Sequence, residues 1–225
     1  RADTSNNVAG GLPLMTEILL IRHGETEWNA AELFRGRADI PLNENGVRQA
    51  ELLAEYLEAK QIDAISSSRL RRARKTAEII AGRHGREVKN AGGLIDIDFG
   101  EWQGLSHQEV KDKYGELYTT WINHPDRVRF PSGESLGEVR ERAQALVNKL
   151  VTEYEGKTIV LVSHRVVNKV LICALLGLGD AHFWNIRQDT GGITTFSYQN
   201  GRFILIRHND TSFLAAMGQA PLGDF

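Results

Sequence analysis

Two short apolar runs, each followed directly by a histidine, constrain the fold of this chain most strongly. Ile18–Ile21 runs into Arg22 and His23, and Thr158–Ser163 runs into His164. Both runs are too short for a typical amphipathic helix and apolar enough for strands buried on both faces, as in a parallel sheet. Because parallel strands end at one edge of their sheet, where α/β proteins bind ligands, we expect Arg22 and both histidines to converge there.

The side chains after the first run have a narrow range of chemistry. Arg22 is a permanent cation whose planar fork fits a phosphate or a carboxylate. His23 is a nucleophile or base near neutral pH, and the amide of Asn29 can donate to the same anion. Gly24 lets the backbone turn sharply and approach a ligand closely. The stretch therefore predicts an anion site beside a reactive imidazole.

The tripeptide Arg-His-Gly is weak evidence by itself, because the chain contains it twice. The second copy, 83–85, follows a helical pattern and is interpreted as a basic last turn with a glycine stop. The position after a buried strand, rather than the tripeptide, is what favours a functional role for residues 22–24.

Helical and strand patterns alternate along the rest of the chain, which predicts an α/β fold. Helices are expected near 47–57, 70–81, 135–154 and 166–176, a further strand at 63–67, and a hairpin of 193–199 and 202–207 around Asn200 and Gly201. This order predicts a three-layer αβα sandwich, with a mainly parallel central sheet and one antiparallel edge. A chain of 225 residues suits one domain, which we place at 15–214.

Three segments stand apart from this alternation. Residues 1–14 are interpreted as an extension or a cloning remnant, and 215–225 as a C-terminal tail. The segment 96–133 is rich in aromatic residues and fits the pattern least. A long insertion beside a sheet edge often forms a lid or a specificity wall, and we expect that role here. An extra pair of helices that pack only locally is the alternative.

Composition and charge narrow the classes of protein that remain. The chain is 41% hydrophobic and 25% charged with a net charge of −2, which argues against broad binding to nucleic acids or membrane surfaces. No apolar stretch has the length of a membrane span. The single cysteine, Cys173, lies in an apolar run, so we expect it to fill the core. The lack of an intrachain disulfide fits a reducing, cytoplasmic compartment.

Two local sequence patterns argue against nucleic acids and metal ions as ligands. The basic run 69–75 spreads its charges over several faces of a helix, and the amino end of that helix attracts anions, so nucleic-acid binding is not favoured. The spaced pairs of ligands typical of metal sites are absent, and Arg22 beside His23 would repel a cation. We therefore expect no metal.

Residues 20–29 resemble the signature of the histidine phosphatase superfamily, the phosphoglycerate-mutase-like proteins. The similarity continues through 34–46 and in further blocks to Leu214, so it covers nearly the whole chain. The resemblance implies a phosphoglycerate-mutase-like fold and a phosphoryl-transfer reaction without a cofactor.

The resemblance also implies roles for individual residues. His23 would attack phosphorus and form a phosphohistidine that water then hydrolyses. Arg22, Asn29, Arg72 and His164 would surround the phosphoryl oxygens and stabilise the transferring group. Arg72 enters this set because its block resembles the family pattern Ser-x-Leu-x-Arg-Ala-x-x-Thr.

The proton donor is the first departure from the family pattern. The family places a glutamate where this chain has Asp96, whose side chain is one methylene shorter. Aspartate can perform the same proton transfer if its loop lies closer to the substrate. We expect Asp96 to serve, and Asp98 and Glu101 are the alternatives.

The second departure is Arg165, where family members often have glycine. A bulky cation at the start of that helix would either contact the substrate or point away. Arg35 and Arg37, in the block after the signature, add to the same positive field. Arg35 and Arg165 are therefore candidates for a substrate pocket that suits a second negative group.

The function expected from these features is that of a phosphomonoester hydrolase acting on small phosphorylated metabolites. The block around 99–102 looks more like the phosphatase branch of the family than like its mutases. The alternatives are a cofactor-dependent phosphoglycerate mutase and a catalytically impaired relative that binds phosphorylated ligands or a protein partner. A nucleic-acid binder is more distant still. Pairing into a homodimer is a further hypothesis.

Overall fold

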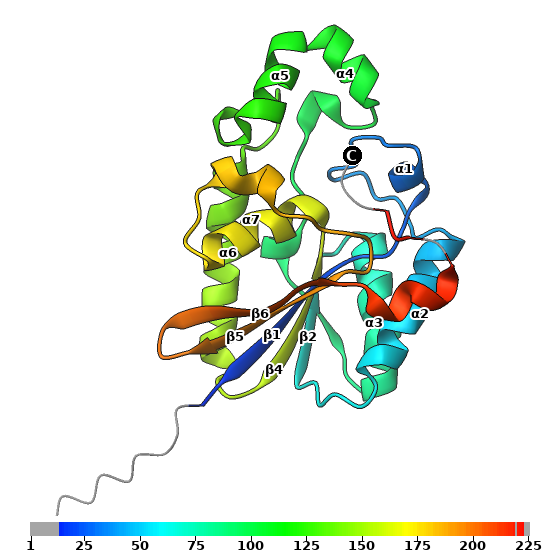
Figure 1. Cartoon of the computed structure of the whole chain (residues 1–225), viewed down its shortest axis with the longest axis vertical. Helices are drawn as coiled ribbons and strands as arrows, with labels where there is room; N and C mark the ends of the chain where they lie inside the picture. The colour runs from blue at the N-terminus through cyan, green and yellow to red at the C-terminus, as the bar shows by residue number, and fades with distance from the viewer. Residues whose placement is uncertain (1–13, 219, 223–225) are drawn as a thin grey trace, which may run out of the picture.

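A single sheet of six strands, in the order β3-β2-β4-β1-β5-β6, forms the centre of the molecule (Figure 1). The structure, a computed structural model, describes residues 14–218 and 220–222. The strands are β1 (Thr16–Arg22), β2 (Ala64–Ser67), β3 (Val88–Asn90), β4 (Thr158–Ser163), β5 (Ile193–Gln199) and β6 (Arg202–Asp210). β3, β2, β4 and β1 run parallel, and β5 and β6 add an antiparallel edge. The predicted fold class is thus confirmed.

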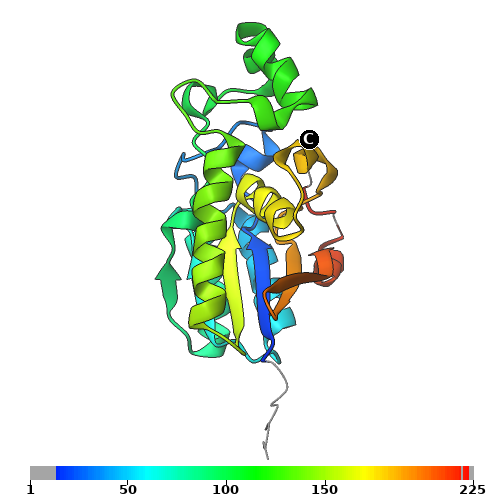
Figure 2. The same ribbon diagram turned by 90° about the vertical axis from the view of Figure 1, so that its left-hand side faces the viewer.

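Helices cover both faces of this sheet and complete the predicted three layers (Figure 2). The helices are α1 (Glu27–Ala30), α2 (Glu44–Leu57), α3 (Arg71–His84), α4 (His107–Lys113), α5 (Gly115–Asn123), α6 (Leu136–Glu153) and α7 (Arg165–Leu175). α6 and α7 pack on one face, and α2 and α3 pack on the other. Residues 1–13, 219 and 223–225, which belong to the predicted extension and tail, lie outside the described residues.

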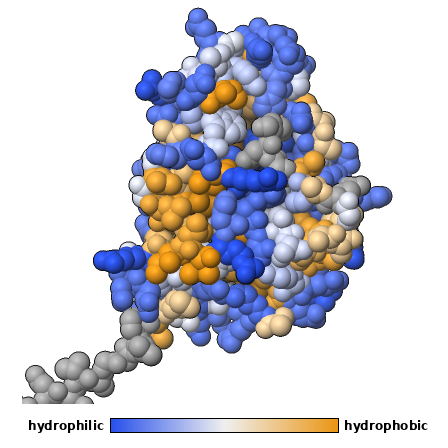
Figure 3. All heavy atoms as spheres, in the orientation of Figure 1, coloured by the Kyte–Doolittle hydropathy of each residue, from blue (hydrophilic) through white to orange (hydrophobic). Residues whose placement is uncertain are grey.

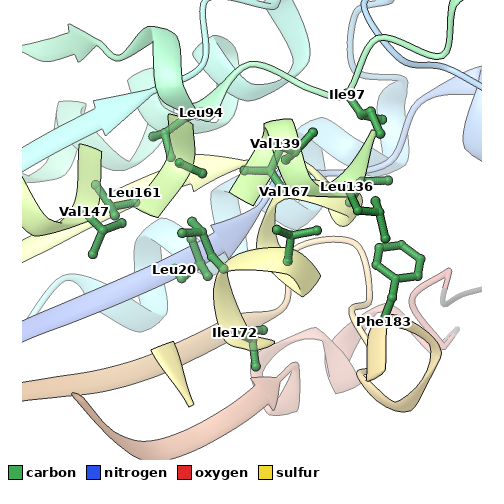
Figure 4. Close-up of a cluster of buried hydrophobic side chains, with 14 of the residues drawn as sticks. Leu20, Leu94, Ile97, Leu136, Val139, Val147, Leu161, Val167, Ile172 and Phe183 are labelled. Atoms are coloured by element: carbon green, nitrogen blue, oxygen red, sulfur yellow. The ribbon is translucent and has the colours of Figure 1, made fainter. Parts of the chain in front are cut away.

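The side chains of the two central strands alternate between two hydrophobic cores. Leu20 of β1 and Leu161 of β4 point into the core beneath α6 and α7, where they meet Val147 and Val167 (Figure 4). The neighbouring positions, such as Ile21, point into the second core beneath α2 and α3. Because both faces are buried, these strands consist of continuous apolar runs, as the sequence predicted.

Local signals in the sequence set several element boundaries. Ser135 and Glu138 form the capping box that opens α6, with the Glu138 carboxylate accepting from the Ser135 backbone N–H at 2.8 Å. Gly85 ends α3 in a left-handed conformation, as expected for the second Arg-His-Gly. Asn200 and Gly201 both have positive φ, which is the geometry of a tight turn between β5 and β6.

The register of β1 and β4 brings the predicted functional residues together. Arg22 lies opposite Ser163 in the parallel pair, so the next residues, His23 and His164, leave the sheet side by side. The His23 backbone N–H donates to the Ser163 carbonyl at 3.0 Å, which extends the pairing by one residue. The expectation that two strands deliver their histidines to one edge is therefore met.

The segment 96–133 folds into α4, α5 and short 3-10 turns above the ends of the strands (Figure 1). It is fixed by aromatic packing: Trp121 is fully buried, and its ring lies 5.0 Å from Phe183 and 5.2 Å from Trp184, between centroids. The indole N–H of Trp184 donates to the Trp121 carbonyl at 2.9 Å. The insertion is thus joined to the segment after α7, and its role as a lid stays a prediction.

Two features of the fold were not foreseen. The short edge strand β3 pairs with β2 over only three residues, which is too few for a periodic signal in the sequence. Gly24 is not among the glycines with a positive φ, so a left-handed conformation is not what requires glycine here. A Cβ atom at Gly24 would lie 2.4 Å from the Gly46 carbonyl oxygen, so the glycine is required by contact with the start of α2.

The opposite edge of the sheet carries exposed apolar side chains. Ile204 and Ile206 of the edge strand β6 are 50% and 61% exposed. Figure 3 shows hydrophobic side chains gathered on the same face, in the region of α7 and the β5–β6 hairpin. Exposed edge strands of this kind are sites where another chain can pair, which is relevant to a homodimer.

Candidate active site

The site is built on His23 and His164, which meet beyond the carboxyl ends of β1 and β4. Their ring centroids are 5.2 Å apart, with an angle of 60° between the ring planes. His23 is 1% exposed and His164 is fully buried. Two imidazoles from distant parts of the sequence therefore share one buried position at the ligand-binding edge of the sheet.

The tautomer of His23 is set by its neighbours. Its Nδ1 atom lies 2.6 Å from the Gly24 carbonyl oxygen, which can only accept a hydrogen bond, so Nδ1 carries the hydrogen. The Nε2 atom accepts a hydrogen bond from Nε of Arg72 at 3.2 Å, which requires a lone pair there. The arrangement leaves the lone pair of the neutral ring on Nε2 of His23.

Arg72 connects the parts of the site. It lies in the first turn of α3, is fully buried, and donates from Nε to Nδ1 of His164 at 3.2 Å as well as to His23. Its Nη1 and Nη2 atoms donate to the carbonyls of Ala38 and Gly36, each at 2.7 Å. Arg72 thereby fixes both histidines against the loop that follows α1.

Both histidines are held neutral. Burial is the main cause that lowers the pKa of His23 well below 6.5, and the charges of Arg72 and Arg22 lower it further. Burial also lowers the pKa of His164 well below 6.5, followed by the charge of Arg72. A neutral imidazole is the form that can attack phosphorus, so the local charges favour the reactive state at pH 7.

His164 offers a hydrogen-bond donor to the site. Its Nδ1 atom accepts from Arg72, so the hydrogen of the neutral ring is on Nε2. Among the residues that the structure describes, Nε2 of His164 is buried without a hydrogen-bond partner. A buried N–H of this kind can donate to a phosphoryl oxygen.

Asp96 lies inside the site, and the two alternative acids lie outside it. Its Oδ2 atom accepts from Nη2 of Arg72 at 3.0 Å and lies 3.7 Å from Nδ1 of His164. Asp98 instead accepts from Arg37 at 3.3 Å. Glu101 is exposed and accepts from the Tyr114 hydroxyl at 2.7 Å. Despite its shorter side chain, Asp96 therefore joins the site through its contacts with Arg72 and His164.

Arg22 and Asn29 border the same site. The guanidinium of Arg22 is 1% exposed and donates from Nη1 to the Gln188 carbonyl. Asn29 is buried, and its Oδ1 atom accepts from the Thr26 backbone N–H at 3.0 Å in the cap of α1. Because its oxygen is used in this way, its amide N–H groups remain as the donors that could meet a phosphate.

Arg35, Arg165 and His107 belong to the surroundings of this candidate site. Arg35 is 6% exposed, and its Nη1 donates to the carbonyls of Leu33 and Trp28 at 3.2 and 3.3 Å. Arg165 is 4% exposed and follows His164 directly at the start of α7. Burial lowers the pKa of His107 to about 4, and the charges of Arg165 and Arg35 lower it as well. His107 thus brings α4 of the insertion to the edge of the site.

Several supporting groups were not anticipated from the sequence. The Gln188 carbonyl orients Arg22, and the Thr76 hydroxyl accepts from the Gly24 N–H at 3.2 Å. The carbonyls of Gly36 and Ala38 hold Arg72. Backbone carbonyls carry no signature in the residue types, whereas Thr76 falls within a block that resembles the family and could have been noticed there.

Two other features are absent from the described residues, 14–218 and 220–222. In that part of the chain, no three histidine, cysteine, aspartate or glutamate side chains are grouped so that they could hold a metal ion. Within it, too, no helix is both long enough and apolar enough to cross a membrane.

The fold and the paired histidines place the chain in the phosphoglycerate-mutase-like class of α/β proteins. It belongs to branch 1 of the histidine phosphatase superfamily, whose family model matches residues 18–211. The family expected from the sequence is therefore confirmed.

Individual relatives agree with this assignment. Phosphoserine phosphatase 1 of Hydrogenobacter thermophilus is 35% identical over 200 residues, which cover 89% of this chain and 95% of that protein. The structure of Bacillus stearothermophilus YhfR matches with a TM-score of 0.85 at 32% identity, covering 88% of this chain and 99% of that one. A phosphoserine phosphatase from Entamoeba histolytica, solved with 3-phosphoglyceric acid, matches with a TM-score of 0.81 at 35% identity, covering 88% and 99%.

Proposed function

We propose that this protein hydrolyses phosphomonoesters of small metabolites through a phosphohistidine at His23, without a metal or other cofactor. The observation that carries the proposal is the arrangement of Nε2 of His23. This atom is unprotonated, buried, and 3.2 Å from Nε of Arg72, which also contacts His164. A nucleophile with a cation beside it suits attack on an anionic phosphoryl group.

In the first step, the lone pair on Nε2 of His23 forms a bond to phosphorus as the bond to the alcohol oxygen breaks. Arg22, Arg72, Asn29 and the N–H of His164 would donate to the three phosphoryl oxygens and stabilise their charge. The Asp96 carboxyl group would give its proton to the leaving oxygen, which departs as a neutral alcohol.

In the second step, water attacks the phosphohistidine. Asp96, now a carboxylate, would take a proton from that water, and the bond between phosphorus and Nε2 breaks to release phosphate and neutral His23. The contacts of Asp96 support this role, because its Oδ2 atom accepts from Arg72 at 3.0 Å and lies 3.7 Å from Nδ1 of His164. The acid and the base are thus the same group in alternate protonation states.

Relatives support the choice of small phosphorylated metabolites as substrates. The Entamoeba histolytica phosphoserine phosphatase was solved in complex with phosphoserine and with 3-phosphoglyceric acid. Both are small phosphate esters, and by analogy we assign this class to the present chain. A phosphoglycerate mutase would return the phosphoryl group to bound product instead, so an assay for interconversion of phosphoglycerates separates the two activities.

The proposal is tested by phosphate release in EDTA from a panel of small phosphate esters, p-nitrophenyl phosphate and 3-phosphoglycerate among them. Wild type is expected to turn over at least one ester, and His23→Ala none. His182→Ala, which alters an exposed histidine on the segment after α7, is the matched control and should retain activity. Equal activity of wild type and His23→Ala would refute the proposal. If wild type releases no phosphate from any ester of the panel, the result would favour a binding protein that keeps the shape of the site.

We also propose that the protein works in the cytoplasm and that two copies can pair. The exposed Ile204 and Ile206 support pairing, because they offer apolar area on β6, the last strand in the sheet order. Sedimentation of wild type and of an Ile204→Lys and Ile206→Lys double variant tests it: a dimer that the double variant loses is the expected result. A monomeric wild type would contradict the pairing.

A further inference from the structure

The loop 187–192, which leads into β5, lies against the end of β1 and contacts Arg22. Nη1 of Arg22 donates to the Gln188 carbonyl. The Arg22 backbone N–H donates to the Gly192 carbonyl at 3.2 Å, and the Gly191 N–H donates to the Arg22 carbonyl, also at 3.2 Å. The loop therefore holds both the backbone and the guanidinium of an arginine that we assign to the phosphate.

The Gln188 carbonyl belongs to the same peptide group as the backbone N–H of Asp189, and we call this group the 188–189 peptide. A peptide group is planar, and no cis peptide bond occurs among the described residues, so its C=O and N–H point in opposite directions. The Asp189 N–H donates to Oδ1 of Asn209 at 2.9 Å. One rigid group thus has the guanidinium of Arg22 at one end and the amide of Asn209 at the other.

Asn209 and Asp189 form a reciprocal pair around this peptide. The Asn209 amide donates from Nδ2 to Oδ2 of Asp189 at 2.8 Å, while its Oδ1 accepts from the Asp189 N–H. A backbone N–H can only donate and a carboxylate can only accept, so only one orientation of the amide satisfies both. Asp189 is 3% exposed, which shields its half of the pair from water. The 188–189 peptide is therefore held from the side opposite to Arg22.

The backbone at the end of β6 suits asparagine in particular. The φ angle of Asn209 is +49°, in the left-handed region that asparagine enters more readily than most residues. Its N–H donates to the Thr194 hydroxyl of β5 at 3.2 Å. A Cβ atom at Gly192 would lie 2.3 Å from Oδ1 of Asn209, so the loop packs directly on the amide. The backbone and the packing together aim this side chain at the 188–189 peptide.

The Gln188 carbonyl helps to set the plane of the Arg22 guanidinium. Gln188 is fully buried, and its own side chain donates to the Gly192 carbonyl at 3.3 Å. A guanidinium donates two parallel hydrogen bonds to a phosphate only when its plane faces the oxygens. A displacement of about 1 Å at a binding group can lower a rate on the order of a hundredfold. The position of the 188–189 peptide therefore bears on how Arg22 meets a phosphate.

We propose that Asn209 is a positioning residue for Arg22 and acts on it through the 188–189 peptide. The inference rests on the proposed function, because it takes Arg22 as a phosphate ligand. It deepens that function by adding a residue that acts without touching the substrate. The phosphate contacts of the site then depend on a side chain at the end of the edge strand β6.

Two substitutions at Asn209 test the pair. Asn209→Asp keeps the size of the side chain but sets a second carboxylate against Asp189. Asn209→Gly removes the amide, and glycine accepts the positive φ at this position without strain. Asn200→Asp and Asn200→Gly are the matched controls, because Asn200 has a similar φ, +52°, and is exposed in the turn of the same hairpin.

The measured quantities are kcat/KM for an ester that wild type turns over and the Kd of inorganic phosphate by calorimetry. Each Asn209 variant should lower kcat/KM on the order of tenfold to a hundredfold, the loss expected from a small misplacement of a binding group. The Kd of phosphate should rise in the same variants. Both Asn200 variants should match wild type in the two quantities.

Reversing the pair should restore it. In the double variant Asn209→Asp with Asp189→Asn, the amide introduced at position 189 can donate to the carboxylate introduced at position 209. That carboxylate can still accept from the backbone N–H of residue 189. Arg187, which donates to Asp189 at 2.9 Å, has a side chain that is 67% exposed, so losing this ion pair should matter little. We expect the double variant to recover most of the kcat/KM that Asn209→Asp loses, and no recovery would contradict the proposal.

A double-mutant cycle with Arg22→Gln separates positioning from a general effect on the fold. If Asn209 acts through Arg22, Asn209→Gly should change kcat/KM by about twofold or less in the Arg22→Gln background. A purely structural role would lower kcat/KM by the same factor in both backgrounds. That result would refute the proposal.

The outcomes also separate this inference from the proposed function. If wild type hydrolyses esters through His23, and both Asn209 variants keep its kcat/KM and its phosphate Kd, the hydrolase stands and the positioning role is refuted. If wild type hydrolyses no ester, the proposed function fails, and the Kd of phosphate in the same variants decides the positioning role. If wild type does not bind phosphate either, both fall.

Discussion

Nε of Arg72 lies 3.2 Å from Nε2 of His23, and the hydrogen bond between them can form only when that imidazole nitrogen is unprotonated. The same Nε also faces Nδ1 of His164 at 3.2 Å. One guanidinium therefore orients the proposed nucleophile and the second histidine, and its charge helps to keep both of them neutral. Under the proposed mechanism, a cation in this position would stabilise the phosphoryl group and also set the protonation state of the histidine that attacks it.

Arg72→Lys should abolish most of the activity. A lysine keeps one charge but cannot donate to His23, His164 and Asp96 at once, because it lacks the planar fork. We expect kcat to fall on the order of 100- to 1000-fold. Arg74→Lys, on the partly exposed face of α3, is the matched control and should stay near wild type. Retention of more than about half of the activity by Arg72→Lys would contradict the role of this residue.

The acid limb of the rate profile should report the lowered pKa of His23. Because burial and two arginines lower this pKa, the imidazole stays neutral to a lower pH than a free histidine does. We therefore expect kcat/KM, corrected for the ionisation of the substrate, to fall only well below pH 6.5. An acid limb at or above pH 6.5 would show that His23 is not held neutral in this way.

Stability should also depend on pH through the buried histidines. An unfolded histidine takes up a proton near pH 6.5, whereas His23 and His164 remain neutral to lower pH, so acid favours the unfolded state. Above about pH 6.5 both states are neutral, and the free energy of unfolding does not depend on these histidines. Below that pH, each histidine lowers the free energy of unfolding by about 1.4 kcal/mol per pH unit.

Urea unfolding between about pH 7.5 and pH 5 measures this slope. His164→Gln removes one of the two groups and should lower the slope by about 1.4 kcal/mol per pH unit. His182→Gln, at an exposed position, controls for the loss of a histidine as such. A slope that His164→Gln leaves unchanged would be inconsistent with a buried, neutral His164.

Asp96→Asn should lower turnover while keeping the shape of the side chain. An amide can still accept from Arg72 but cannot give or take the proton, so we expect a loss on the order of 100- to 10,000-fold for esters with poor leaving groups. The loss should be smaller for p-nitrophenyl phosphate, whose leaving group needs less protonation. Asp98→Asn and Glu101→Gln are the comparison variants, because these acids bond to Arg37 and Tyr114 instead. An equal loss for all three acids would argue against Asp96 as the proton donor.

Gly24→Ala should destabilise the fold at the base of the site. The added Cβ would lie 2.4 Å from the Gly46 carbonyl oxygen, and a backbone atom cannot move aside without shifting α2. We expect a loss of about 1–3 kcal/mol, measured by urea unfolding. Gly82→Ala is the matched control, because nothing lies within 4 Å of the new atom and the position is inside α3. That change should stabilise the protein by about 0.5–1 kcal/mol.

The parts of the site that follow from the sequence are those set by strand geometry. The sequence predicts two buried strands, at Ile18–Ile21 and Thr158–Ser163. Because these strands pair in parallel, His23 and His164 lie side by side at their ends. The selection of Arg72 from several neighbouring arginines depended on the family resemblance, because helical periodicity alone does not say which one faces the sheet edge. Asp96 could be ranked above Asp98 and Glu101 only in the same way.

The features of the site that could not be predicted from the sequence depend on contacts between segments that are far apart in the chain. The approach of Gly24 to Gly46 joins two loops whose distance no local pattern encodes. The use of the Asn29 oxygen as a helix cap depends on where α1 begins, and that helix spans only four residues. The field of Arg165 on Arg35 and His107 likewise requires three segments to be placed in space.

The most direct test of the central claim is to trap the phosphorylated enzyme. Wild type is mixed with a substrate that it turns over, quenched in alkali to preserve a bond between phosphorus and nitrogen, digested, and analysed by mass spectrometry. The account predicts one phosphoryl group on the peptide that contains His23. It predicts none on the corresponding peptide of the His23→Ala variant. A phosphoryl group on any other residue, or turnover by His23→Ala, would contradict it.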